Sequence, residues 1–172
     1  MISPIQKFHA VTDHIATGAQ PGPQDFAWLR EHGFTAVVNL NVPSARNYLR
    51  DEGDRVRALG MLYIADPVDC SKLTTSVFEQ FRAYMAQARA GKVFVHCAAN
   101  IKSTALVYAY RVRELGHDPV ASLLEAMRIA ELEPKWFEWF VRIGVTPSLT
   151  VRSVADEVRG RRHPADRAST TP

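Results

Sequence analysis

Three short apolar runs, separated by stretches long enough for a helix, constrain the fold of this chain most. The runs cover residues 35–40, 61–64 and 93–97; each has the length of a strand and contains β-branched residues. Strands that alternate with helices are typical of α/β folds, because helices supply the crossover between parallel strands. The sequence therefore predicts an α/β fold with a mainly parallel central sheet of about four or five strands, flanked by helices.

Predicted helices lie before, between and after these runs. Apolar periodicity and glycine stops place them at residues 24–32, 50–59, 76–90, 105–115, 118–132 and 136–141. Ser76 and Glu79 fit a capping box at the start of the third helix. Asp118 provides an N-cap for the fifth, and Pro119 suits its first turn.

Two further features complete the predicted sheet. Residues 8–11 and 15–17 read as two short strands around a polar turn, so we expect a hairpin before the first helix. The run at 93–97 is apolar on both faces, which is typical of a strand in the centre of a sheet.

Length and composition indicate one soluble domain. The chain has 172 residues, of which 47% are hydrophobic and 23% charged, and a chain of this size can bury a sufficient core by itself. We expect one domain over residues 1–151. From residue 152 to 172 the sequence loses apolar periodicity and gains basic residues and proline, which predicts a mobile tail.

Charge, hydropathy and cysteine use narrow the class of function. A net charge of +3 favours anionic small ligands or phosphoproteins and does not require nucleic acid. No apolar run is long enough to span a membrane and the N-terminus has no apolar signal core, so we expect a cytoplasmic protein without membrane contact. The only cysteines, Cys70 and Cys97, indicate burial or reactivity more than a disulfide framework.

The segment HCAANIKST, residues 96–104, joins the third run to a predicted helix and carries the chemistry. In open α/β sheets, ligands bind beyond the carboxyl ends of strands, which is where Cys97 lies. Backbone amides of residues 98–104 and the helix dipole favour a bound anion and a thiolate. The alternative is that Cys97 only packs as a small core thiol.

The same segment resembles the phosphate loop of cysteine-dependent protein tyrosine phosphatases, in the compact dual-specificity branch. The chain is more closely similar to bacterial phosphatase-like proteins of that superfamily. The shared segments are ATGAQPGPQDFAWLREHGFTAVVNLN (16–41), LGMLYIADPVD (59–69) and ALVYAYRV (105–112). The resemblance spans roughly residues 8–143 and implies a dual-specificity phosphatase-like fold.

The resemblance also implies a mechanism without metal or cofactor. Cys97 attacks phosphorus, and water hydrolyses the resulting cysteinyl-phosphate. His96 supports the loop and the thiolate from behind, and the hydroxyls of Ser103 and Thr104 could donate to the sulfur. For Thr104, a helix N-cap is an equal alternative. The residues implied to bind phosphate are Ala98, Ala99, Asn100, Ile101, Lys102, Ser103 and Thr104.

The general acid in this superfamily is an aspartate from a loop after the preceding strand. Here that loop reads DPVDC, and Asp69 falls at the family position, with Asp66 as the second candidate. An acid must hold a proton when the reaction starts, so its pKa should be raised by burial or by nearby negative charge. Either aspartate could instead be a loop or capping residue.

The loop arginine of the superfamily is missing. Six residues after the cysteine stands Ser103, and five residues after it, where the closer bacterial relatives have arginine, stands Lys102. Lysine keeps the charge but loses the planar two-point grip on phosphate, and one such transition-state contact is commonly worth about 3 kcal/mol. Asn100 replaces the usual glycine and tolerates a left-handed backbone.

Two hypotheses follow, and a third ranks last. The first is a phosphatase, weak for lack of arginine, acting on phosphotyrosine or a small phosphate monoester. The second is a binding module that holds inorganic phosphate, sulfate or a phosphorylated protein in the loop without turnover. Sulfur transfer through a persulfide on Cys97 would not explain the resemblance over residues 16–69. If Asp69 faces Cys97, the adjacent Cys70 could form a reversible disulfide with it.

Overall fold

The computed structural model describes residues 3–145, so the predicted tail at 152–172 and the predicted boundary at residue 151 lie outside the described residues. Five strands and six helices follow one another along this part of the chain. The strands are β1 His9–Ala10, β2 Ile15–Gly18, β3 Phe34–Asn39, β4 Leu62–Ala65 and β5 Lys92–His96. The helices are α1 Asp25–Glu31, α2 Glu52–Ala58, α3 Thr75–Ala88, α4 Ile101–Arg113, α5 Pro119–Ile129 and α6 Pro134–Arg142.

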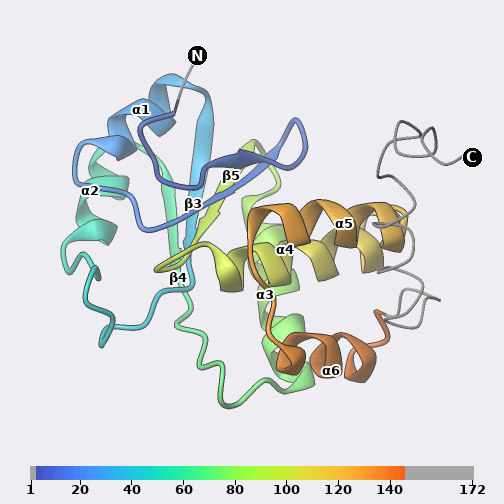
Figure 1. Cartoon of the computed structure of the whole chain (residues 1–172). Helices are drawn as coiled ribbons and strands as arrows, with labels where there is room; N and C mark the ends of the chain where they lie inside the picture. The colour runs from blue at the N-terminus through green and yellow to red at the C-terminus, as the bar shows by residue number, and fades with distance from the viewer. Residues whose placement is uncertain (1–2, 146–172) are drawn as a thin grey trace, which may run out of the picture.

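The strands form one sheet in the order β1-β2-β5-β3-β4 (Figure 1). Only the β1–β2 hairpin is antiparallel, and the other three pairings are parallel. The predicted α/β fold with a mainly parallel sheet is thus confirmed, as is the central position of β5. His96 at the end of β5 pairs with Gly18 of β2 and Asn39 of β3, so three strands end together beside Cys97.

Each face of the sheet carries its own apolar core (Figure 1). On one face, α1 and α2 pack through Phe26, Leu29 and Val56. The other face is covered by the helices after β4, whose largest buried side chains include the aromatic residues Phe78, Phe81, Tyr108, Trp136, Trp139 and Phe140. These large aromatic side chains therefore form much of the core on this face.

Helix starts are where prediction and structure differ. Helix α4 begins at Ile101 instead of residue 105, because Asn100 takes a left-handed conformation (φ 66°) and acts as its N-cap. The predicted capping box at Ser76 is wrong: the N-cap of α3 is Thr74, whose hydroxyl contacts that of Ser76 at 2.7 Å. Asp118 does cap α5, since its carboxylate accepts from the Ala121 amide at 2.7 Å.

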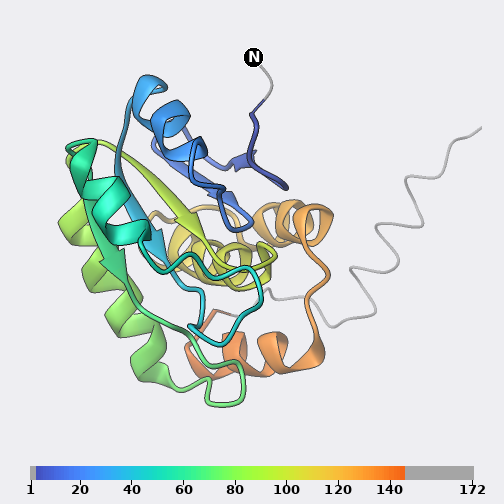
Figure 2. The ribbon, with the colours of Figure 1, turned by 90° about the vertical axis from the view of Figure 1, so that its left-hand side faces the viewer.

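The loop that joins β3 to α2, cyan in Figure 2, reaches the loop that follows β5. Segments far apart in sequence are thus brought to the carboxyl edge of the sheet. Among residues 3–145, no helix is long and apolar enough to cross a membrane.

Candidate active site

Cys97 lies at the carboxyl edge of the sheet, directly after the central strand, and is 2% exposed. Residues 98–100 separate it from the start of α4 at Ile101. The Ser103 hydroxyl stands 3.6 Å from Sγ of Cys97, the contact that the sequence predicted. The same hydroxyl is 2.8 Å from Oδ1 of Asn100, and its single proton serves one acceptor at a time.

Asn100 shapes the loop through every polar atom of its side chain. Its left-handed backbone confirms the conformation predicted for the position where the wider superfamily has glycine. The amide nitrogen donates to the carbonyl of Lys7 at 2.8 Å and to the hydroxyl of Thr17 at 3.2 Å. Thr104 donates to the Asn100 carbonyl at 2.5 Å, so the alternative in which Thr104 is the N-cap is wrong.

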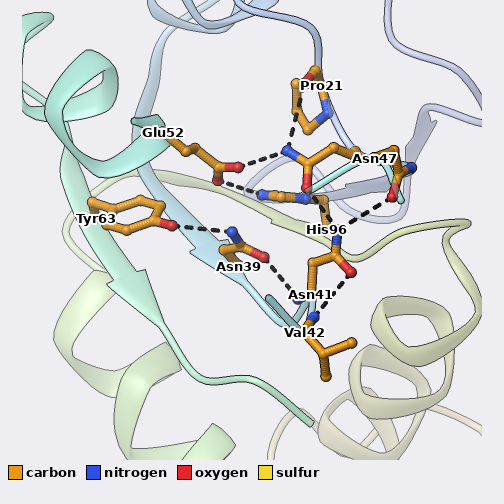
Figure 3. Close-up of polar contacts among 9 residues, drawn as sticks. Pro21, Asn39, Asn41, Val42, Asn47, Glu52, Tyr63 and His96 are labelled. Atoms are coloured by element: carbon orange, nitrogen blue, oxygen red, sulfur yellow. Dashed lines mark hydrogen bonds and ion pairs between the residues drawn. The ribbon is translucent and has the colours of Figure 1, made fainter. Parts of the chain in front are cut away.

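Behind the loop, His96 forms a fully buried pair with Glu52, the first residue of α2. The His96 Nε2 and Glu52 Oε1 atoms are 2.7 Å apart, and both side chains are 0% exposed (Figure 3). Gln20 donates to the second carboxylate oxygen at 2.6 Å. The His96 ring also stacks on Phe94, with ring centroids 5.7 Å apart. This geometry orients the residue before Cys97 from two directions.

The same network continues through Asn41 to Asn47 (Figure 3). Asn41 donates to Oε1 of Gln20 at 2.9 Å, and its amide nitrogen is also 3.5 Å from Oδ1 of Asn47. Asn47 then donates to the carbonyl of Ala98 at 2.9 Å. Both residues that flank Cys97 are therefore held by side chains from elsewhere in the chain: Glu52 of α2 contacts His96, and Asn47 of the loop between β3 and α2 contacts Ala98.

Sequence reasoning missed Glu52 and the amide residues of this network. Glu52 stands in a polar helix and looks like a surface residue in the sequence. Gln20 and Asn41 both lie inside the 16–41 segment that carries the family resemblance, and that was the available signal.

Lys102 does not stand free in the loop. Its ammonium donates to the Val68 carbonyl at 2.7 Å and to the Leu40 carbonyl at 3.3 Å. The side chain thus links the Cys97 loop to the segments that follow β3 and β4. Its positive charge helps to lower the pKa of Asp69, the residue after Val68.

The two candidate acids differ in their surroundings. Asp69 is exposed, and hydrogen bonds from the amide and hydroxyl of Ser71, at 2.9 and 2.8 Å, lower the pKa of its carboxyl. Asp66 is half-buried, and this burial raises the pKa of its carboxyl. Asp66 therefore retains a proton more readily, which favours it as the general acid, whereas the family spacing favours Asp69.

Cys70 is a half-buried free thiol, and Cys97 is also free. Burial raises the pKa of Cys70, and the Cys97 thiol adds to that rise, whereas Lys102 and Lys135 lower it. A reversible disulfide between the two cysteines under oxidation stays a hypothesis. In residues 3–145, no group of three His, Cys, Asp or Glu side chains is placed to hold a metal ion.

A family model described as "DSP-PTPase phosphatase fused to NAD+ Kinase" matches residues 7–133. The chain belongs to this family. Membership confirms the predicted relation to dual-specificity phosphatases within the protein tyrosine phosphatase superfamily. No curated protein matched the chain.

Solved structures agree with the family. A DUF442 protein of Shewanella putrefaciens CN-32, provisionally described as a phosphatase, is 26% identical with a TM-score of 0.72, over 82% of this chain and 93% of that one. Tk-PTP in its active form is 17% identical with a TM-score of 0.68, over 80% and 95%. TpbA of P. aeruginosa is 16% identical with a TM-score of 0.65, over 92% and 94%. The last two share the dual-specificity phosphatase-like fold.

Proposed function

We propose that this chain of the phosphatase–NAD kinase family is a cysteine-dependent phosphatase that acts on phosphate monoesters. One observation carries the proposal. The Cys97 thiol sits between the central strand and the first turn of α4, with a hydroxyl 3.6 Å from its sulfur. The first-turn amides of a helix have no partner earlier in the helix and favour an anion. A thiol and an anion site from one loop suit attack on a phosphate ester.

The reaction divides into two displacements. In the first, the Cys97 thiolate forms an S–P bond while the P–O bond to the leaving group breaks, and an aspartate gives the leaving oxygen a proton. In the second, water attacks phosphorus, the same aspartate takes a proton from the water, and the thiolate leaves. Asp69 and Asp66 are the candidates for that aspartate. His96, held by Glu52, positions the loop.

Phosphotyrosine or a small aryl phosphate is the proposed substrate class. A variant of TpbA, 15% identical to this chain with a TM-score of 0.64, has been solved in complex with phosphotyrosine. The loop residues 98–104 would surround the phosphoryl oxygens, and inorganic phosphate or sulfate would occupy the same place.

A second candidate is a phosphate- or phosphoprotein-binding module without turnover. Two observations favour it: carbonyls already bind the Lys102 ammonium, and hydrogen bonds from Ser71 stabilise the ionised form of Asp69. A loop that lacks both an arginine to hold two phosphate oxygens and a protonated acid beside it can still bind an anion.

Hydrolysis of para-nitrophenyl phosphate tests the proposal. We expect turnover by the wild-type protein and a loss of at least about hundredfold in Cys97→Ser, because the nucleophile is removed. Cys70→Ser is the matched control, since this second free thiol has no proposed role in turnover, and it should keep the wild-type rate. Lys102→Arg and Ser103→Arg test which position faces phosphate, and the one that does should raise the rate. Wild-type turnover no greater than that of Cys97→Ser, with phosphate still raising the Tm, would leave the binding module.

A further inference from the structure

The N-terminal segment before β1 is anchored against the sheet close to the Cys97 loop. Ile5 is 4% exposed, and the ring of Phe8 stacks on Phe94 with centroids 6.0 Å apart. The carbonyl of Gln6 accepts from the Ala19 amide at 2.9 Å. Lys7 lies between these two apolar anchors, and its own side chain is exposed.

The backbone of Lys7 is held in an unfavourable conformation. Within residues 3–145, Lys7 (φ 52°) and Asn100 (φ 66°) are the non-glycine residues with positive φ. This region costs an ordinary L-residue roughly 1–2 kcal/mol, and Asn tolerates it better than Lys. The two residues contact each other, because the Asn100 side chain donates to the Lys7 carbonyl at 2.8 Å. Strained backbone of this kind concentrates at functional sites.

The Lys7 side chain reaches the Cys97 loop. Its Nζ atom lies 3.4 Å from the carbonyl oxygen of Ala99, two residues after Cys97. An ammonium carries three donors, and a single long contact leaves others available to an incoming ligand. Lys7 therefore presents a cation at the rim of the loop.

A bound phosphate ester needs such a cation. The ester carries negative charge and approaches a thiolate, and the loop has no arginine. The Lys102 ammonium already donates to two carbonyls, those of Leu40 and Val68. We propose that Lys7 is a substrate-binding residue whose ammonium contacts the phosphate ester at the mouth of the Cys97 loop. This inference rests on the proposed anion-binding function of the loop.

Two substitutions of Lys7 separate its charge from its backbone. Lys7→Asn removes the charge and keeps a residue that tolerates positive φ, whereas Lys7→Arg keeps the charge. Lys92→Gln is the matched control, because Lys92 is also exposed and its Nζ also lies 3.4 Å from a carbonyl, that of His32. Lys92 begins β5, at the opposite end of the strand from Cys97.

Binding of tungstate, a tetrahedral oxyanion, and the steady-state kinetics with para-nitrophenyl phosphate give the readouts. Lys7→Asn should weaken tungstate binding and raise KM by about fivefold at low salt, with kcat nearly unchanged, because the cation attracts the ground state and the transition state alike. The loss should shrink at high salt. Lys7→Arg should restore binding, and Lys92→Gln should match the wild type. Without ligand, none of the three variants should have a lower Tm than the wild type, and Lys7→Asn should match or exceed it because asparagine tolerates positive φ better than lysine.

The outcomes separate the two proposals. Tungstate affinity and KM that are unchanged in Lys7→Asn would overturn the role of Lys7 and leave the phosphatase intact. The same conclusion would follow if Lys92→Gln lowered the affinity and raised KM as much as Lys7→Asn does. Wild-type protein that binds tungstate but shows no turnover would overturn the phosphatase, and a weaker affinity in Lys7→Asn would still support Lys7 as an anion-binding residue. Absence of both binding and turnover in the wild type would overturn both.

Discussion

The Cys97 loop has two sides that are built in different ways. On the support side, Glu52, His96 and three amide residues form a network in which Glu52 and His96 are fully buried. On the acid side, Asp69, Ser71 and Lys102 meet at or near the surface, and their contacts are to a neighbouring residue or to backbone carbonyls. Buried polar groups tolerate few substitutions, whereas exposed groups change at little cost in stability.

This difference teaches that the loop's shape and its chemistry depend on separate residues. The support side fixes the backbone around Cys97. In the proposed reaction, the acid side would supply the proton and part of the positive charge. A few exposed substitutions could therefore convert a phosphatase of this family into a binding protein without disturbing the fold.

The largest expected effect lies on the support side. Glu52→Ala leaves buried His96 and the amide of Gln20 without their partner, so the free energy of unfolding should fall by about 3–5 kcal/mol. Urea unfolding followed by circular dichroism measures this. Asp51→Ala is the control: Asp51 precedes Glu52, and its pair with Arg55 is solvent-exposed, so unfolding should shift little. A change in Glu52→Ala as small as in Asp51→Ala would contradict the idea of a rigid support side.

The second prediction identifies the proton donor on the acid side. Loss of the true general acid should lower kcat by about a hundredfold with phenyl phosphate, whose leaving group needs a proton, and much less with para-nitrophenyl phosphate. Asp66→Asn and Asp69→Asn are compared on both substrates. We expect one of the two to show this dependence on the leaving group.

Each substitution serves as control for the other. If Asp66→Asn shows the larger loss on phenyl phosphate, the general acid is the aspartate that burial keeps protonated. If Asp69→Asn shows it, the general acid is the aspartate at the family position. If neither variant loses more activity on phenyl phosphate than on para-nitrophenyl phosphate, relative to the wild type, then neither aspartate donates the proton.

Most of the fold could be predicted because it depends on local patterns. Runs of apolar residues and glycine or proline stops placed the strands and most helices within a few residues. The start of α4 was missed, because its apolar periodicity begins at Ala105, whereas the helix begins after the left-handed Asn100. Propensity does not reveal that conformation.

The candidate site could be predicted only in part, for a physical reason. Cys97 and its loop are contiguous in sequence, and their place after a strand indicated an anion site. The partner of His96 stands 44 residues away, and the carbonyls bound by Lys102 belong to residues 34 and 62 positions away. Such contacts depend on tertiary packing. The sequence therefore showed that Lys102 carries a positive charge, but not which groups its side chain contacts.

The smallest expected effect also concerns the acid side. Ser71→Ala removes the hydroxyl that donates to Asp69 but keeps the amide that donates to the same oxygen. The pKa of Asp69 should rise toward its ordinary value, because one of the two hydrogen bonds that lower it is lost. A carboxyl whose pKa is lowered in the folded state stabilises the fold at pH values above its ordinary pKa, and this gain is lost as the pH falls. Ser71→Ala has less of this gain to lose, so its free energy of unfolding should fall slightly less on acidification than that of the wild type. NMR titration of the Asp69 carboxyl measures the shift, and an unchanged or lower pKa would show that the hydroxyl bond is not formed in solution.

The central place of β5 has a consequence for how Cys97 meets reagents in solution. A strand paired on both sides exchanges its amide hydrogens among the slowest in a domain, since its exposure requires opening of the whole sheet. Local breathing of the edge strands therefore does not uncover the thiol. Cys97 is 2% exposed, so the rate at which alkylating agents or oxidants modify its sulfur should report on movements of the loop itself and not on the stability of the domain.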